Sequence, residues 1–167
     1  LKLVADITED AWQTPLSSRV DSIANFQHTW AEDDDMIVEQ LILDSENINA
    51  DIVSRVKQVS LTEPNLAKRL VDLDGQVALV SITLNMPDGD KTEATAQVVG
   101  SIRQLTEKYR DAYPDHEFYH TGVVFMNAAF EHEAKSDAST LVPLMFFVIV
   151  IVLWFLLRSA LGTLSTL

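Results

Sequence analysis

Residues 141–157 read LVPLMFFVIVIVLWFLL, a run whose side chains carry no charge, amide or hydroxyl group. An α-helix rises ~1.5 Å per residue, so ~17–25 apolar residues are needed to cross ~30 Å of hydrocarbon. Fourteen of these seventeen residues are Leu, Ile, Val or Phe. At roughly −0.3 to −0.6 kcal/mol each, they contribute about −4 to −8 kcal/mol to insertion. The run predicts a transmembrane helix, because a soluble domain of this size needs no helix that is apolar on every face.

The rest of the chain is acidic. The 167 residues carry a net charge of −13, and Arg158 is the only charged residue after position 140, so residues 1–140 carry −14. About 140 residues suit one compact domain. The charge argues against a nucleic-acid partner and against adsorption to an anionic membrane surface. The absence of cysteine excludes disulfides and thiolate metal sites within this sequence.

The charges beside the apolar run bear on its orientation. Three acidic residues and Lys135 precede the run, and Arg158 follows it. The positive-inside tendency therefore places Arg158 in the cytoplasm and residues 1–140 on the extracytoplasmic side. The sequence starts at Leu1 and shows no signal-peptide pattern. Two arrangements follow from this: a tail-anchored protein with its bulk in the cytoplasm, or an excerpt whose preceding span lies upstream.

The first 32 residues predict an N-terminal segment with a short helix over residues 19–26. Val20, Ile23 and Phe26 would share one face of that helix. The acidic run at residues 32–35 has no glycine at the offset that a calcium loop requires, so it predicts a solvated loop.

Strand-like and helical patterns then alternate over residues 33–122. Strands are predicted over residues 36–43, 70–73, 76–85 and 117–121, with Asp74-Gly75 as the turn of a hairpin. A helix capped by Asn49 is predicted over residues 50–60, and a second helix over residues 92–112. The β-α-β-β-α-β order predicts an α+β, ferredoxin-like domain with an antiparallel sheet.

A last helix leads from this domain into the apolar run. Asn127 is a candidate cap, and neither glycine nor proline interrupts the sequence before Pro143. Residues 123–140 are therefore predicted to connect the domain to a transmembrane helix over residues 141–164. Pro143 stands where a kink would lie at the membrane surface.

Three segments resemble one family of transporters. They are residues 13–28 (QTPLSSRVDSIANFQH), Thr121-Gly122 with residues 126–130 (MNAAF), and Asp137 followed by LVPLM, the apolar run and Leu157-Arg158-Ser159. Together they resemble the first extracytoplasmic loop and second membrane helix of a resistance–nodulation–division exporter. The branch that the chain resembles includes the mycobacterial large membrane proteins and lipid exporters.

The resemblance implies a porter domain outside the bacterial inner membrane, and a proton-driven exporter of hydrophobic or amphiphilic molecules. Its expected partners are the lipid bilayer, the remaining membrane helices, a second porter domain of the same transporter and a lipid-like substrate. The family's proton relay uses acidic residues in central membrane helices. Residues 141–157 contain no ionisable group, so this segment cannot supply that relay.

Two other functions compete with export: an extracytoplasmic sensor domain that signals through its span, and an accessory factor of protein translocation in the same superfamily. Residues 160–167 remain small and apolar, whereas sensors continue into polar helical linkers. This difference favours the exporter.

No pattern predicts catalysis, a cofactor or a metal. His116 and His120 are four residues apart on a predicted turn and strand, where this spacing does not bring side chains together. No serine stands in a glycine-rich elbow, and no glycine loop suits a phosphate. Trp12, Phe26 and Trp30 are candidates for lining a hydrophobic substrate path, with a role in the core as the alternative. We therefore predict a transport protein and not an enzyme.

Overall fold

The computed structural model describes residues 1–32 and 35–164, with side chains in all of these except residue 32 and residues 156–164. The chain divides into two units, Leu1–His120 and Thr121–Leu167. The two central residues of the predicted acidic loop lie outside the described part. The side chain of Arg158, on which the predicted orientation depends, also lies outside it.

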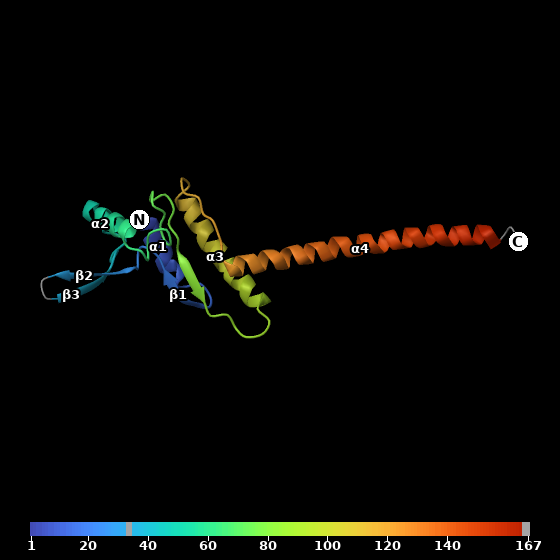
Figure 1. Ribbon diagram of the computed structural model, residues 1–167, viewed down its shortest axis with the longest axis horizontal. Coiled ribbons are helices and arrows are strands. Elements are labelled where there is room, and N and C mark those ends of the chain that lie inside the picture. The colour runs from blue at the N-terminus through green and yellow to red at the C-terminus, as the bar shows by residue number, and fades with distance from the viewer. Residues whose placement is uncertain (33–34, 165–167) are drawn as a thin grey trace. The chain divides into compact units, whose positions relative to one another are not determined.

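The first unit is built from helices and antiparallel strand pairs (Figure 1). Within the described residues, β1 pairs with β4 and β2 pairs with β3, both antiparallel. The α+β class is therefore confirmed. The elements in chain order are α1 (Lys2–Ala11), β1 (Ser17–Asp21), β2 (Gln27–Glu32), β3 (Asp35–Gln40), α2 (Ala50–Thr62), β4 (Ser81–Leu84) and α3 (Thr92–Ala112).

The strands form two separate two-stranded sheets in the described residues. In β1–β4 the register runs from Ser17↔Leu84 to Asp21↔Ser81, with an irregularity between Ser17 and Arg19. The hydrogen bonds thus do not join four strands into one sheet, and the finer ferredoxin-like arrangement remains a prediction.

The predicted helix over residues 19–26 is wrong. Val20 lies in strand β1, and the chain turns immediately after it. The Asn25 side chain accepts from the Ser22 backbone N–H at 2.9 Å and donates to the Val20 carbonyl at 2.7 Å. The Ser22 hydroxyl accepts from Thr8 of α1 at 2.8 Å. These side-chain bonds give the backbone an alternative to a helix, and the spacing of Val20, Ile23 and Phe26 did not reveal them.

Helix α2 confirms the prediction made from its cap. The Asn49 side chain accepts from the Ile52 backbone N–H at 2.9 Å, and Asp51 lies in the first turn. A carboxylate there interacts favourably with the positive end of the helix dipole. Val56 and Val59 of α2 belong to a buried core with Ile23, Ala24, Leu41, Ile42, Leu66 and Val71. Phe26 is partly buried and packs against this core.

The chain between α2 and β4 makes the predicted turn at Gly75, but the strand predicted over residues 70–73 is not formed, because Val71 and Ala78 pair only as an isolated β-bridge. The Asp72 N–H donates to the Val77 carbonyl at 3.1 Å, and the Leu79 N–H donates to the Leu70 carbonyl at 2.8 Å. Gly75 has φ +69, a conformation that glycine adopts without steric cost. The Asp72 carboxylate accepts from the Val77 N–H at 2.7 Å, and this bond lowers the pKa of Asp72. The regular strand that follows is shorter than predicted, because only residues 81–84 pair with β1.

Helix α3 is confirmed over Thr92–Ala112. Val98 is fully buried and Tyr109 is 7% exposed, as expected for members of its apolar stripe. The strand predicted over residues 117–121 is wrong, because this segment pairs with no strand in the described part of the chain. Its alternation resembles a strand, but a strand also needs a neighbour, and Tyr119 is 84% exposed.

The second unit contains α4, a single helix over Val123–Leu164. It begins directly after Gly122, whose φ is +110, so Asn127, the candidate cap, lies inside the helix and not at its start. Its 42 residues correspond to ~63 Å at the usual rise. The helix continues through Pro143, which has no N–H to donate to the Ser139 carbonyl.

Candidate functional site

The first unit contains a partly open cavity of about 680 Å³. Cavities of this size hold small molecules in many proteins. Its walls come from α1, α2 and α3, and from the segments at residues 74–80 and 116–120. Most of the lining is apolar, so the cavity suits the hydrophobic part of a ligand.

One stripe of α1 forms the first wall. Leu3, Val4, Ile7 and Ala11 recur at steps of one, three and four residues, and all four line the cavity. This spacing places them on one side of a helix. Val4 also packs against the core, three of whose buried residues, Ile23, Val56 and Val71, line the cavity as well.

Helix α3 contributes Ile102, Leu105, Thr106 and Tyr109 to the lining. Three of these residues, Ile102, Leu105 and Tyr109, recur at the helical spacing from which this helix was predicted. Ile102 and Leu105 are half-buried because they border the cavity. The sequence therefore identified the right face of the helix without showing that part of it faces a cavity.

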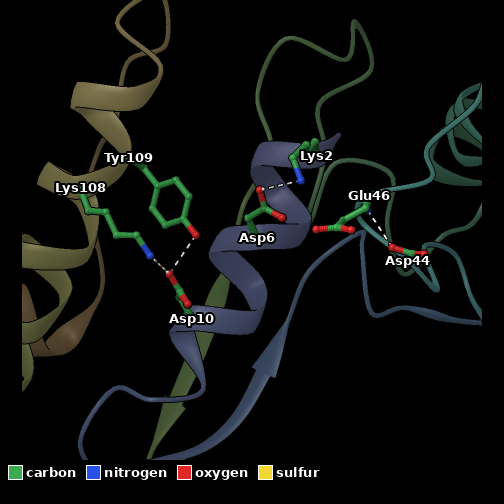
Figure 2. Close-up of polar contacts among 7 residues, drawn as sticks. All are labelled: Lys2, Asp6, Asp10, Asp44, Glu46, Lys108 and Tyr109. Atoms are coloured by element: carbon green, nitrogen blue, oxygen red, sulfur yellow. Dashed lines mark hydrogen bonds and ion pairs between the residues drawn. The ribbon is translucent and has the colours of Figure 1, made fainter.

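A polar cluster ties α1 to α3 at the cavity (Figure 2). The Asp10 carboxylate accepts from Lys108 Nζ at 2.6 Å and from the Tyr109 hydroxyl at 2.9 Å, both at Oδ2. The bond from Lys108 lowers the pKa of Asp10, and Tyr109 adds to this, whereas burial opposes it. Burial raises the pKa of Tyr109, as does the neighbouring carboxylate. Asp10 is therefore ionised at neutral pH, and Tyr109 is neutral.

Helix α3 makes a second polar contact, with the segment that follows it in the chain. His120 Nε2 and the Thr106 hydroxyl are 2.7 Å apart, and the Thr106 hydroxyl is also 2.8 Å from the Ile102 carbonyl. Burial lowers the pKa of His120, and the positive charges of Arg103 and Arg110 lower it further. The imidazole is thus neutral at pH 7, and it holds the segment after α3 against that helix.

The aromatic residues proposed for a substrate path do not line this cavity. Trp12 follows α1 and is 50% exposed, while Phe26 packs against the core. Trp30 lies on β2, where its ring stacks on His28 at a centroid distance of 5.6 Å. The three do not converge on the cavity, and their role in transport remains a prediction.

The cavity is also lined by the two histidines that stand four residues apart in the sequence. His116 and His120 both line it, together with Glu117. Among the described side chains, no group of three or more His, Cys, Asp or Glu residues is arranged to hold a metal ion. The polar groups therefore serve hydrogen bonding to the protein or to a ligand.

Helix α4 has a different character from the first unit. Its stretch Val123–Phe155 is long and apolar enough to cross a membrane, and an 18-residue window within it has a mean hydropathy of 2.5. None of the apolar window is buried within the protein, and the large side chains from Leu144 to Phe155 are 44–72% exposed. Such a surface requires an apolar environment outside this chain.

Comparisons with known proteins give one match. The family model described as the MMPL family matches residues 9–166, which include the end of α1 and all of the later strands and helices through α4. Searches of curated proteins and of solved structures found no match. The chain therefore belongs to the MMPL family, whose members are membrane transporters of the resistance–nodulation–division type.

Proposed function

We propose that residues 1–122 form an extracytoplasmic porter domain and that α4 is a membrane helix of a proton-driven exporter of hydrophobic or amphiphilic molecules. The observation that carries this proposal is the exposed apolar surface of α4 in a member of the MMPL family. Lipid is the environment in which such a surface is stable. The remaining membrane helices and a second porter domain would be its protein partners.

The cavity is the proposed contact site for the substrate. Its apolar lining would accept the hydrophobic part of the molecule, and the rim residues His116, Glu117 and Lys57 would contact a polar part. No covalent chemistry is required of these side chains. The residues of the cavity would bind and release a substrate, while proton movement in other membrane helices would drive the cycle.

The transport test uses Nile red, a lipophilic dye, in cells that express the complete gene. We expect efflux that a protonophore abolishes. The variant Ile102→Trp fills part of the cavity and should reduce efflux severalfold. The control Gln104→Trp places the same side chain on an exposed position of α3. Efflux that resists the protonophore would contradict proton drive, and equal efflux from both variants would contradict the role of the cavity.

The orientation is tested by labelling. Residues 1–167 contain no cysteine, so Leu73→Cys, in a protein whose cysteines outside this segment are replaced by serine, introduces a single thiol at a position that is 52% exposed. A membrane-impermeant maleimide added to intact spheroplasts should label this thiol. Labelling only after lysis would place the domain in the cytoplasm and refute the proposed location.

A further inference from the structure

Ser60 of α2 contributes a buried hydroxyl to the wall of the cavity. The residue is 3% exposed, and it lines the cavity together with Val56 of the same helix. Within the described part of the chain, the Ser60 Oγ atom has no hydrogen-bond partner. A buried polar group without a partner costs free energy, and such groups are rare in folded proteins. The position of this hydroxyl at the wall of a cavity indicates a partner that enters the cavity.

The other buried polar side chains of the lining already have partners. Among the described residues, the buried side chains of the lining that carry a polar group are Ser60, Thr106 and Tyr109. The Thr106 hydroxyl is 2.7 Å from His120 Nε2, and the Tyr109 hydroxyl donates to the Asp10 carboxylate at 2.9 Å. Of the three hydroxyls, that of Ser60 is therefore the one left for a ligand.

The surroundings of the hydroxyl determine which chemical group it can meet. The other buried residues of the lining include Ile23, Val56 and Val71, which are apolar. A charged group is costly in such surroundings unless it is paired, so the group that meets Ser60 is neutral. The Ser60 Oγ atom is covered by neighbouring protein atoms. Rotation about χ1 gives the hydroxyl three staggered positions from which to meet a ligand.

We infer that Ser60 donates a hydrogen bond to a neutral oxygen atom, such as that of a carbonyl group, in the molecule that the cavity binds. The inference rests on the proposed role of the cavity in substrate binding. Lys57 is exposed, and it also lines the cavity. It precedes Ser60 by three residues, so the two are neighbours on one face of α2. A ligand that reaches both residues carries its neutral oxygen close to its polar head. Ser60 thus selects amphiphiles that have a carbonyl group near the head over plain hydrocarbons.

The test compares two probes that differ in one group, pyrenebutyric acid methyl ester and butylpyrene. Equilibrium dialysis of the complete protein in amphipol against each probe gives the dissociation constants, with amphipol alone as the blank. Ser60→Ala should weaken binding of the ester about twofold to tenfold, because one neutral hydrogen bond is lost. Binding of butylpyrene should not change. Equal effects on the two probes, or no effect on the ester, would overturn the inference.

A matched variant controls for the loss of a buried hydroxyl. The Ser17 hydroxyl is also buried and without a partner among the described residues, but Ser17 does not line the cavity. Ser17→Ala should therefore leave the binding of both probes unchanged, and a weaker binding of the ester would contradict the assignment to Ser60. Ser60→Ala should melt at or above the wild-type temperature, because it removes an unpaired polar group. A clear loss of stability would show that the hydroxyl has a partner inside the protein, and this too would refute the inference.

Two further measurements separate this inference from the proposed function of the cavity. Ile102→Trp fills part of the cavity and should weaken the binding of both probes. If it does so while Ser60→Ala binds the ester like wild type, the cavity is a binding site and only the role of Ser60 is wrong. If Ile102→Trp changes neither probe, the proposed function of the cavity fails as well. Isotope-edited infrared spectra should show the carbonyl stretch of the bound ester at a lower frequency in wild type than in Ser60→Ala, and identical frequencies would contradict the hydrogen bond.

Discussion

The Tyr109 hydroxyl donates a 2.9 Å hydrogen bond to the Asp10 carboxylate, although 99 positions separate the two residues in the sequence. The same carboxylate oxygen accepts from Lys108 at 2.6 Å. The pair joins α3 to α1, and both helices line the cavity. The geometry of the cavity therefore depends on a contact between the ends of the first unit.

Removing the hydroxyl should destabilise the unit without changing its packing. Tyr109→Phe keeps the buried ring and deletes the donor to a charged acceptor, which should cost about 1–2 kcal/mol. Thermal unfolding followed by near-ultraviolet circular dichroism measures this. The control Tyr113→Phe makes the same change in a ring that stacks on Tyr109, and it should have a smaller effect. Equal effects of the two variants would show that the Asp10 contact contributes nothing.

Acid should release the same contact. The pKa of Asp10 is lowered in the folded protein, so its stabilising contribution is complete above the ordinary value of about 3.9. This contribution is lost as the pH falls through the lowered pKa. The melting temperature of wild type should drop over this acid range more steeply than that of Asp10→Asn. Parallel curves for the two proteins would contradict this assignment.

His120 should confer a second pH dependence at milder acidity. Its pKa is lowered on folding, so the unfolded chain binds a proton more readily. The contribution of neutral His120 to the free energy of unfolding is therefore at its full value above about pH 6.5. It declines as the pH falls from there through the pKa of the folded protein. His120→Asn should flatten the melting curve in this range. The control His132→Gln, at an exposed position on α4, should retain the wild-type slope, and a flattened curve there would refute the role of His120.

Two glycines should respond to alanine in opposite directions. Gly122 has φ +110, where an alanine is strained by about 1–3 kcal/mol. Gly100 lies exposed within α3, with no atom within 4 Å of an added Cβ, so alanine should stabilise that helix by about 0.5–1 kcal/mol. Denaturation should show a loss for Gly122→Ala and a gain for Gly100→Ala. A gain at both positions would mean that the start of α4 does not require the glycine conformation.

The apolar run should tolerate one charge but not two. An aspartate near the centre of a span costs about 2.5–3.5 kcal/mol, which leaves the sum for residues 141–157 at about −1 to −5 kcal/mol. Val148→Asp should therefore still insert in a glycosylation-mapping assay, and Val148→Asp with Val152→Asp should insert much less. Val148→Ala is the control. Complete loss of insertion with the single aspartate would show that the run is a weaker span than its composition indicates.

The sequence predicted best those elements whose signals are local. The Asn49 cap and the repeated apolar positions around Val98 identified α2 and α3, because cap and periodicity are both contained within a helix. The apolar run identified α4 in the same way. The cap of α4 was predicted wrongly at Asn127, because the helix begins directly after Gly122, whose positive φ the sequence does not reveal.

The predictions that were wrong concern segments whose structure depends on residues far away in the sequence. The prediction of a helix over residues 19–26 relied on spacing alone, while Val20 pairs with Ile82, more than 60 positions away. No residue near Val20 in the sequence indicates that it pairs with Ile82. The cavity has the same origin, because Ile7, Val56 and Ile102 come from three helices. Each sequence segment shows an apolar face, but the volume between the faces is a property of the assembled unit.

Pro143 leaves α4 without the backbone hydrogen bond that would join residue 143 to the Ser139 carbonyl. The Ser139 carbonyl, which an interior residue would engage, lies just before the apolar run that starts at Leu141. At the headgroup layer water can satisfy that carbonyl, whereas the same gap in the hydrocarbon would cost several kcal/mol. Flexing at this level therefore exposes no additional backbone group to lipid. A bend at Pro143 would leave the backbone hydrogen bonds of the following apolar residues intact.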